Sequence, residues 1–400
     1  RFILVPRYAD SRKKLYWRNY SLAPLRMATD TSPAFPPNRL VSLDIFRGLI
    51  MFLLVAEGAG VYHALTDATA EGSLAAAIMD QFHHHPWNGL RFWDLIQPYF
   101  MFIVGVAMWF SVKNRLKKGQ SPAQVRRHIL QRCLILLALG VTLHIGYRQR
   151  LVWELWNVLS QLSVTILLAY LVMRLPDRSQ LLISLGLLLL TELLYRFTGI
   201  AGYDQPFVKD QNFGSFMDML LMGKINDGGG WVAINCIPTA AHTIWGVLAG
   251  KLLDSSRDAM QKVKILVLAG VIGLVVGYGL DLAGLTPIIK RICTSSFVIV
   301  SGGWCLLTLA FFYWLADIRG HRKWGWFLLI IGTNSIFIYV FMETVGSQWF
   351  VGFVSIFAKG LSGWFFDSPH LGAILTAFLA LALAWGLCYW LYRRRIFFKI

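Results

Sequence analysis

Three consecutive histidines, His83, His84 and His85, precede a long apolar segment that begins soon after Asp94. An imidazole titrates near neutral pH, so such residues can serve as a catalytic base, a pH sensor or a metal ligand. They can equally lie in a solvated loop without a chemical role. A metal site is disfavoured, because residues on one helix face stand three or four apart and the chain has no HxxxH or HExxH spacing.

The stretch "PWNGL" (86–90) follows the histidines directly. It supplies a proline, a glycine-bearing turn and an aromatic residue, which would hold one imidazole in a fixed position. Asp94 can cap the helix that follows, or it can orient an imidazole by accepting its hydrogen bond. The local sequence therefore favours an ordered loop around one of the histidines.

Other charged residues lie within apolar segments, where they are costly and usually functional. Asp44 and Arg47 are three apart and would share a helix face, either as a local ion pair or as part of a site. Glu57 lies near the far end of the same segment, where a carboxylate needs a partner. Arg132 lies about one turn into the third segment, where it either reaches toward lipid headgroups or contacts the phosphates of an anionic cofactor.

Polar residues also mark two later segments. Asn235, Thr239 and His242 have the spacing of one helix face, which suits either interhelical hydrogen bonds or a binding site. Asn334 and Glu343 stand at opposite ends of another segment, where the Glu343 carboxylate would meet a cationic or hydroxylated ligand.

The elements that must position these residues are membrane helices. The 400 residues are 56% hydrophobic and 15% charged, whereas soluble domains carry roughly a quarter charged residues. Crossing a bilayer takes about 20 apolar residues per helix. We therefore predict an all-α polytopic membrane protein with about ten transmembrane helices, near 43–65, 95–113, 129–147, 154–174, 180–198, 231–252, 263–283, 294–316, 325–344 and 371–392.

The net charge of +17 does not indicate nucleic-acid binding, because the cations lie in loops between apolar segments. The positive-inside rule explains this pattern and places both termini in the cytoplasm. The basic loops, expected to be cytoplasmic, are the N-terminus, 113–127, 174–178, 251–264, 319–323 and the tail; the external loops are 66–94, 199–230 and 343–370. The alternation holds only if 345–362 does not cross, so we expect a re-entrant or interfacial external segment there.

We expect one transmembrane domain, 39–400, after a poorly ordered basic extension, 1–38. Met27 looks like a more natural start than Arg1, so residues 1–26 are a candidate mis-called extension. No internal repeat is evident, which weakens a transporter interpretation. The five cysteines show no paired spacing and indicate apolar packing rather than disulfides or a thiolate metal site: Cys133, Cys236, Cys293, Cys305 and Cys388.

Some stretches carry a family resemblance: "RLVSLDIFRG" (39–48), "HHPWNGLRFWDLIQPYFMFIVG" (84–105), "QRCLILLALG" (131–140), "IGTNSIFIYV" (331–340) and the terminal "YRRRIFFKI". Together, and in this order, they resemble the transmembrane heparan-α-glucosaminide N-acetyltransferase family, which includes the bacterial NagX-type proteins. The resemblance runs from about residue 39 to 400. It implies a membrane enzyme that takes acetyl from cytosolic acetyl-CoA, without a metal, and delivers it to the amine of a glucosamine across the membrane.

The resemblance also implies which residues carry the chemistry. The family's essential histidine, three residues before the Trp of WNGL, matches His84, and its aspartate after WNGL matches Asp94. Its arginine early in the following helix matches Arg132, and its opening Asp/Arg pair matches Asp44 and Arg47. The asparagine of its penultimate helix matches Asn334, and the acidic residue after it matches Glu343.

We therefore expect His84 to act as a general base or as a transient acetyl carrier. Asp94 would fix the tautomer of its ring, and Asn88 would brace the loop or donate to the oxyanion. The direct route is favoured, because it needs no hydrolysis-prone intermediate. The phosphates of CoA are expected at Arg132, Arg47, Lys113, Arg126 and Arg127, and the acceptor sugar at Glu57, Asn235, His242, Asn334 and Glu343.

Two departures from the family bear on the acceptor: "AEGAG" (56–60) stands where an asparagine is common, and Ser160-Gln161 replaces a Gln-Arg pair. The large lumenal domain of the lysosomal members is absent, so we expect a multi-pass protein of a bacterial inner membrane. A homodimer is common among such relatives. Two alternatives stay open: an amino-sugar permease of the same fold without acyl transfer, and acylation of another acceptor such as a cell-envelope glycan.

Overall fold

A computed structural model describes residues 40–365 and 369–398 of the chain. Within these residues the expected all-α class is confirmed, with an isolated antiparallel bridge between Asn88 and Ile289 as the one β-type pairing. The expected extension 1–38 lies outside the described residues. The expected single domain, 39–400, stays a prediction.

The helices follow one another as α1 (Val41–Gly58), α2 (Val61–Asp67), α3 (Leu74–Asp80), η1 (Phe92–Leu95), α4 (Ile96–Lys117), α5 (Pro122–Arg148), α6 (Val158–Val172), α7 (Asp177–Phe197), α8 (Phe213–Met222), η2 (Ala233–Asn235), α9 (Cys236–Asp254), α10 (Ala259–Leu282), α11 (Ser295–Phe312), η3 (Tyr313–Ile318), η4 (Lys323–Gly325), α12 (Trp326–Thr333), α13 (Ser335–Phe341), η5 (Met342–Phe350), α14 (Val351–Phe365) and α15 (Pro369–Arg393). Two of these segments, η3 and η5, are π-helical.

Local sequence explains several helix boundaries. Ser121 and Gln124 form a capping box ahead of α5, and Pro122 occupies its first position, where no amide donor is needed. Asn157 caps α6 by accepting from the amide of Leu159. Gly60, at φ 82°, ends the α1 run and lets α2 turn by 57°.

Seven helical segments of the described residues are long and apolar enough to span a bilayer, or eight if the bent pair α1–α2 counts as one span. The chain is thus a membrane protein, but the expected ten spans are not confirmed, and neither is the side on which the termini lie. One reason is helix length: α6 has 15 residues, fewer than the roughly 20 that a bilayer needs. The seven are Phe92–Lys117, Pro122–Arg148, Asp177–Phe197, Ala259–Leu282, Ser295–Ile318, Ser335–Gly363 and His370–Arg393.

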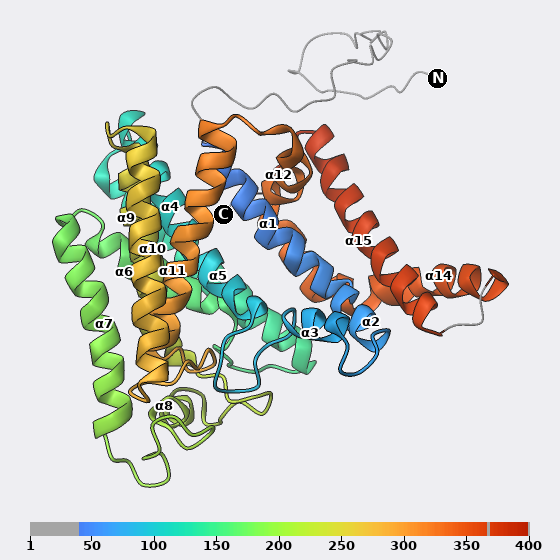
Figure 1. Cartoon of the computed structure of the whole chain (residues 1–400), viewed down its shortest axis with the longest axis horizontal. Coiled ribbons are helices and arrows are strands. Elements are labelled where there is room, and N and C mark those ends of the chain that lie inside the picture. The colour runs from blue at the N-terminus through green and yellow to red at the C-terminus, as the bar shows by residue number, and fades with distance from the viewer. Residues whose placement is uncertain (1–39, 366–368, 399–400) are drawn as a thin grey trace, which may run out of the picture.

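The expected span 325–344 has other boundaries in the structure. It is interrupted at Asn334, between α12 and α13, and the helix then runs on through η5 into α14 without a stop at residue 344. In Figure 1, α14 lies beside α15 at the edge of the bundle. The expectation that 345–362 does not cross the membrane stays a prediction.

Two neighbouring helices approach so closely that only glycine fits between them. A methyl group on Gly246 of α9 would overlap the carbonyl oxygen of Phe102 in α4, and one on Gly105 would overlap that of Thr243. Such small residues let membrane helices pack backbone against backbone. The α4–α9 contact sets the position of the loop that precedes α4, which carries the histidines.

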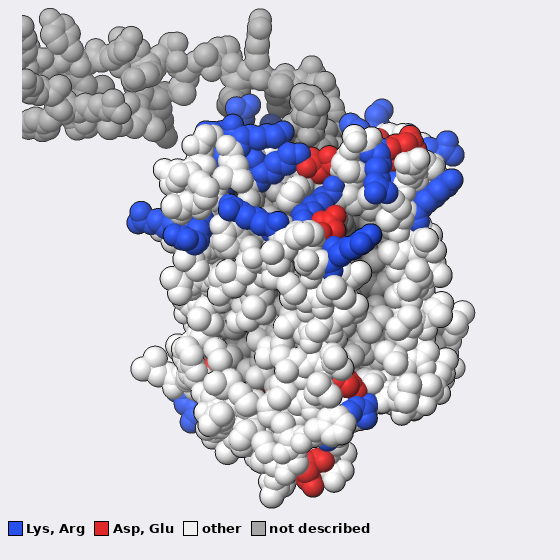
Figure 2. Space-filling model, turned by 90° about the vertical axis from the view of Figure 1, so that its left-hand side faces the viewer, with Lys and Arg blue, Asp and Glu red and all other residues white. Residues whose placement is uncertain are grey.

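The charged side chains are unevenly distributed over the molecule. On the face shown in Figure 2, Lys and Arg side chains gather at one end, and a broad band with few charges follows. The helices α2, α3 and α8 lie at the opposite end in Figure 1. Below, the first end is called the basic end and the second the histidine end.

Candidate active site

The histidine loop, residues 83–91, is held by the buried carboxylate of Asp94. Asp94 accepts a hydrogen bond from His84 Nδ1 at 2.9 Å, from the amide of His85 at 3.2 Å and from the amide of Arg91 at 2.9 Å. It is fully buried. The two roles weighed for Asp94, helix cap and orienting partner of an imidazole, are therefore filled by one side chain.

A second loop, residues 283–294, pairs with the histidine loop and brings a buried lysine to it. The amide of Gly89 donates to the carbonyl of Ile288 at 2.8 Å, next to the bridge between Asn88 and Ile289. Lys290 Nζ then lies 3.1 Å from His84 Nδ1 and 3.7 Å from the nearer Asp94 oxygen, with Lys290 only 5% exposed.

The His84 Nδ1 has an acceptor, the Asp94 carboxylate at 2.9 Å, and a donor, the Lys290 ammonium at 3.1 Å. In the tautomer whose Nδ1 donates to Asp94, Nε2 keeps the lone pair. Burial, together with the ammonium of Lys290, lowers the pKa of His84 to about 4 against the opposing effect of Asp94. The ring is neutral at physiological pH and can accept a proton at Nε2.

Two indoles form the surroundings of this cluster. The ring of Trp231 lies 5.4 Å from that of His84, and Lys290 Nζ lies 5.3 Å from the Trp231 ring. Trp93 packs on the other side, with 6.5 Å between its ring and His84. Because burial outweighs the attraction of Asp94, the pKa of Lys290 is lowered to about 8.

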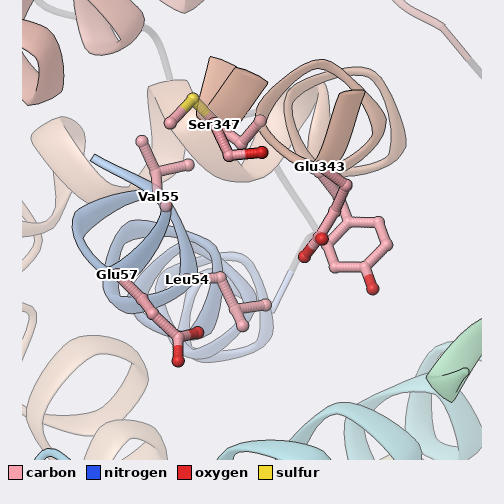
Figure 3. Close-up of a pocket in the computed structure, with 8 residues that line it drawn as sticks. Leu54, Val55, Glu57, Glu343 and Ser347 are labelled. Carbon is pink, nitrogen blue, oxygen red and sulfur yellow. The ribbon is translucent and has the colours of Figure 1, made fainter. Parts of the chain in front are cut away.

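A cavity of about 270 Å³ lies between α1 and the helix that contains η5. Figure 3 shows Leu54, Val55 and Glu57 on the α1 side and Glu343 and Ser347 on the facing helix. Tyr147 donates a hydrogen bond to Glu343, and Tyr339 completes the wall. The structure thus brings two predicted acceptor-site residues, Glu57 and Glu343, together.

His84 does not line this cavity, but Glu57 connects the two places. The Trp93 indole donates a hydrogen bond to the Glu57 carboxyl, and Lys290 acts on the same carboxyl electrostatically. The histidine cluster and the two-carboxylate cavity therefore share Trp93 and Lys290 as neighbours.

Arg132 of α5 lies near Arg47 of α1 and Arg115 of α4. The positive charges of Arg47 and Arg115 act on the Arg132 guanidinium. The Nε of Arg132 is buried without a hydrogen-bond partner among the described residues. Arg47 donates to Asp44 at 2.9 Å, so that predicted pair is present. Like charges held this close suit an anionic ligand such as a phosphate.

The other residues predicted to bind CoA are not part of this group. Lys113 pairs with Asp254, which also accepts from the Trp109 indole. Arg126 and Arg127 are exposed on the first turns of α5. Arg115, which belongs to the basic loop 113–127 expected at the CoA phosphates, lies near Arg132 instead.

Three of the predicted acceptor-site residues lie outside the cavity. His242 is buried against α11, where Nε2 lies 2.9 Å from Ser301 Oγ. The amide of Asn334 bonds to the tail, donating to the carbonyl of Ile396 at 3.1 Å and accepting from the amide of Phe398 at 2.9 Å. Asn235 is buried with neither amide atom bonded among the described residues. Asn88 has an exposed side chain, and its backbone braces the loop.

Sequence analysis missed Lys290. One feature could have pointed to it: Lys290 and Arg291 are adjacent cations in a loop, 283–294, that the positive-inside rule places on the external side. Cations that break this rule need a local reason. Here the reason is the carboxylate of Asp94, 3.7 Å away.

Comparison with known proteins gives consistent matches. The family model described as "Heparan-alpha-glucosaminide N-acetyltransferase, catalytic" matches residues 39–279. The heparan-alpha-glucosaminide N-acetyltransferase of Mus musculus is 33% identical over 106 residues, which are 26% of this chain and 14% of that protein. The protein of the same name from Homo sapiens is 34% identical over 116 residues, which are 28% of this chain and 15% of that protein. The matched stretch thus spans about one seventh of these relatives.

Proposed function

Because the chain belongs to the heparan-alpha-glucosaminide N-acetyltransferase family, whose catalytic model covers residues 39–279, we propose that it transfers acetyl from acetyl-CoA to the amine of a glucosamine-type sugar. The observation that carries the proposal is the His84–Asp94 pair, whose Nδ1 also lies 3.1 Å from the Nζ of buried Lys290. A neutral imidazole has its lone pair available at neutral pH, while its lowered pKa makes it a weaker base than an unperturbed histidine.

The proposed step is a direct transfer. The amine nitrogen attacks the thioester carbonyl carbon, and His84 Nε2 takes the proton that the nitrogen loses as the C–N bond forms. The tetrahedral intermediate then breaks its C–S bond, and the CoA thiolate takes the proton back from Nε2. Asp94 holds the ring throughout, and the ammonium of Lys290 lies close enough to stabilise negative charge that develops beside the ring.

A second route uses His84 as a transient acetyl carrier. Nε2 would attack the thioester, release CoA and pass the acetyl group to the sugar amine. The direct route is favoured, because an acetyl-imidazole hydrolyses readily beside water, and the His84 side chain is 34% exposed. Asn88 supports the loop through its backbone, and its exposed side chain is a candidate donor to the oxyanion.

Arg47, Arg115 and Arg132 form the proposed site for the phosphates of acetyl-CoA. The unpartnered Nε of Arg132 and the mutual repulsion of the three cations are the features that fit an anion. Along α1, Glu57 lies ten residues beyond Arg47, or about 15 Å. The extended thioester arm of acetyl-CoA would cover that distance toward the histidine end. In this proposal the basic end and both termini face the cytosol.

Glu57 and Glu343 form the proposed acceptor site. Carboxylates accept hydrogen bonds from sugar hydroxyls and amines, and Tyr147 and Tyr339 add hydroxyl groups. The cavity of about 270 Å³ suits a single sugar ring better than an extended glycan, which would have to leave through its mouth. Location in a bacterial inner membrane and assembly as a homodimer stay part of the proposal.

The alternative function is an amino-sugar permease of the same fold. It predicts uptake of sugar into vesicles that contain no acetyl-CoA. It does not explain why the Nε of Arg132 is buried without a hydrogen-bond partner among the described residues, so the acetyltransferase is favoured.

The test uses purified protein with acetyl-labelled acetyl-CoA and a panel of amino sugars. We expect N-acetylated sugar from the native protein and a loss of turnover of about 10²- to 10⁴-fold in His84→Ala, as for removal of a general base. His84→Ala should still bind acetyl-CoA. His83→Ala is the matched control, since His83 bonds to Thr66 at 2.8 Å rather than to Asp94, and it should retain turnover. Unchanged turnover in His84→Ala would contradict the assignment.

A further inference from the structure

A large apolar groove lies outside the proposed active site. Its volume is about 740 Å³, and residues of α7, α9, α10 and α11 line it. None of the catalytic or acceptor residues proposed above borders it. From Ile265 to Val276, the α10 wall runs eleven residues, or about 17 Å along the helix axis.

Two glycines of neighbouring helices lie in the wall of the groove. Gly273 of α10 packs on Gly303 of α11, where an added Cβ would lie 3.0 Å from the Gly303 Cα. The two backbones therefore lie close together at this part of the wall. Further out, Leu181 and Leu185 of α7 and Ile272 of α10 are exposed. The groove thus opens toward the surrounding bilayer.

The charged groups of the groove lie at its mouth, near helix ends. Asp177 and Arg178 begin α7, Lys251 lies in the last turn of α9, and Arg257 lies in the turn before α10. Lys251 pairs with Asp177 at 2.9 Å. Arg178 and Arg257 are exposed, so the mouth keeps a positive charge of two at the basic end.

We propose that this groove binds an anionic diacyl phospholipid of the bilayer. One acyl chain lies along the apolar wall of α10, and the phosphate lies between Arg178 and Arg257. Anionic headgroups attract basic residues at a membrane surface. The apolar wall contacts the acyl chain where neighbouring lipid tails would otherwise contact it.

Acetyl-CoA does not suit the groove. Its pantetheine arm carries amide groups, and the inner wall offers no polar side chain deeper than the mouth apart from the Trp245 indole, which already donates to Ser184 at 2.9 Å. Burying amides without hydrogen-bond partners is costly. The bilayer, which surrounds α7 and α10, is therefore the source of the ligand.

The experiment titrates the delipidated full-length protein with dioleoyl phosphatidylglycerol or dioleoyl phosphatidylcholine and counts bound lipids by native mass spectrometry. We expect one site that prefers phosphatidylglycerol by about tenfold or more. Arg178→Gln with Arg257→Gln should remove that preference. Ala269→Trp, which places an indole in the groove, should weaken the binding of both lipids.

Arg126→Gln with Arg127→Gln is the matched control, because it removes two exposed arginines from the same end without touching the groove. It should change lipid affinity less than twofold. Equal affinity of the native protein for both lipids, or an equal loss in the control, would overturn the proposal. Displacement of phosphatidylglycerol by free glycerol phosphate would also overturn it, since it would show a phosphate site without a role for the acyl chain.

Discussion

At the residue scale, Lys290 controls the protonation of His84. The two nitrogen atoms, His84 Nδ1 and Lys290 Nζ, lie 3.1 Å apart, so an ammonium beside the ring opposes its protonation. Asp94 pulls the other way, since it accepts the Nδ1 proton. With burial as the largest contribution, the pKa of His84 falls to about 4. The ammonium of Lys290 thus adds to burial in favouring the neutral His84 ring.

Lys290→Met should move the acid limb of the pH profile of kcat/KM. Below its pKa, His84 is protonated and has no lone pair; above it, the ring is a base. Removing the ammonium removes an influence that lowers this pKa, so the limb should move to higher pH, by about 1 to 3 units. The profile is measured with the same amino sugar for both proteins, so that the titration of the acceptor cancels.

Arg291→Gln provides the comparison. Arg291 also lowers the pKa of His84, but its effect is the weakest of those acting on the ring. In Arg291→Gln the acid limb of the pH profile should also move to higher pH, but by less than in Lys290→Met. A limb in Lys290→Met that stays in place, or moves to lower pH, would remove Lys290 from the acid–base chemistry.

At the element scale, the end of α5 is tied to the loop after it and to the segment after α8. Buried Glu154 accepts from Arg148 at 3.2 Å and from Lys224 at 2.5 Å, and its other oxygen lies 2.7 Å from His144 Nδ1. This network holds the last turn of α5, from which Tyr147 reaches Glu343. The cavity that Glu343 lines therefore depends on helices that are far apart in the sequence.

The α4–α9 contact allows a direct test of helix packing. Gly246→Ala places a methyl group on the Phe102 carbonyl, and the helices must separate to admit it. We expect a loss of about 1–3 kcal/mol in the free energy of unfolding, as for other overpacked cores, seen as a lower thermal midpoint in detergent.

Gly386→Ala is the control for this substitution. Gly386 lies within α15, and nothing lies within 4 Å of an added Cβ. Alanine is the better helix former, by about 1 kcal/mol, so this variant should be as stable as the native protein or more so. Equal midpoints for both variants would show that the α4–α9 contact is not tight.

At the scale of the whole molecule, the basic side chains are concentrated toward one end. Figure 2 shows Lys and Arg gathered at one end of that face and a band with few charges next to it. A basic end beside a band with few charges is the pattern that the positive-inside rule describes for a protein in a bilayer.

Single cysteine variants can establish the two sides. Glu71→Cys lies in the exposed turn before α3, and Lys118→Cys lies in the exposed loop after α4. We expect a membrane-impermeant thiol reagent to label Glu71→Cys in intact cells, and Lys118→Cys only after the membrane is opened. The native chain measures the background from its own cysteines. Labelling of both variants from the same side would contradict the proposed topology.

The sequence alone determined the local features of this protein. Its hydropathy predicted an all-α membrane protein, because apolar helix length depends only on neighbouring residues. The spacing of His84 and Asp94 across a proline- and glycine-bearing turn indicated that one could orient the other, and they lie 2.9 Å apart. The motifs around them predicted the family that residues 39–279 match.

Only the tertiary structure decided which distant groups meet. Lys290 is 206 residues from His84, and no periodicity along the chain relates them. Asn334 carried the same motif evidence as Glu343, yet Asn334 bonds to the C-terminal tail while Glu343 faces Glu57 in the cavity. The helix boundaries around residue 334 were likewise decided by the tertiary structure. The reason is physical: hydropathy and spacing follow the chain locally, whereas the packing of helices sets contacts between residues far apart in it.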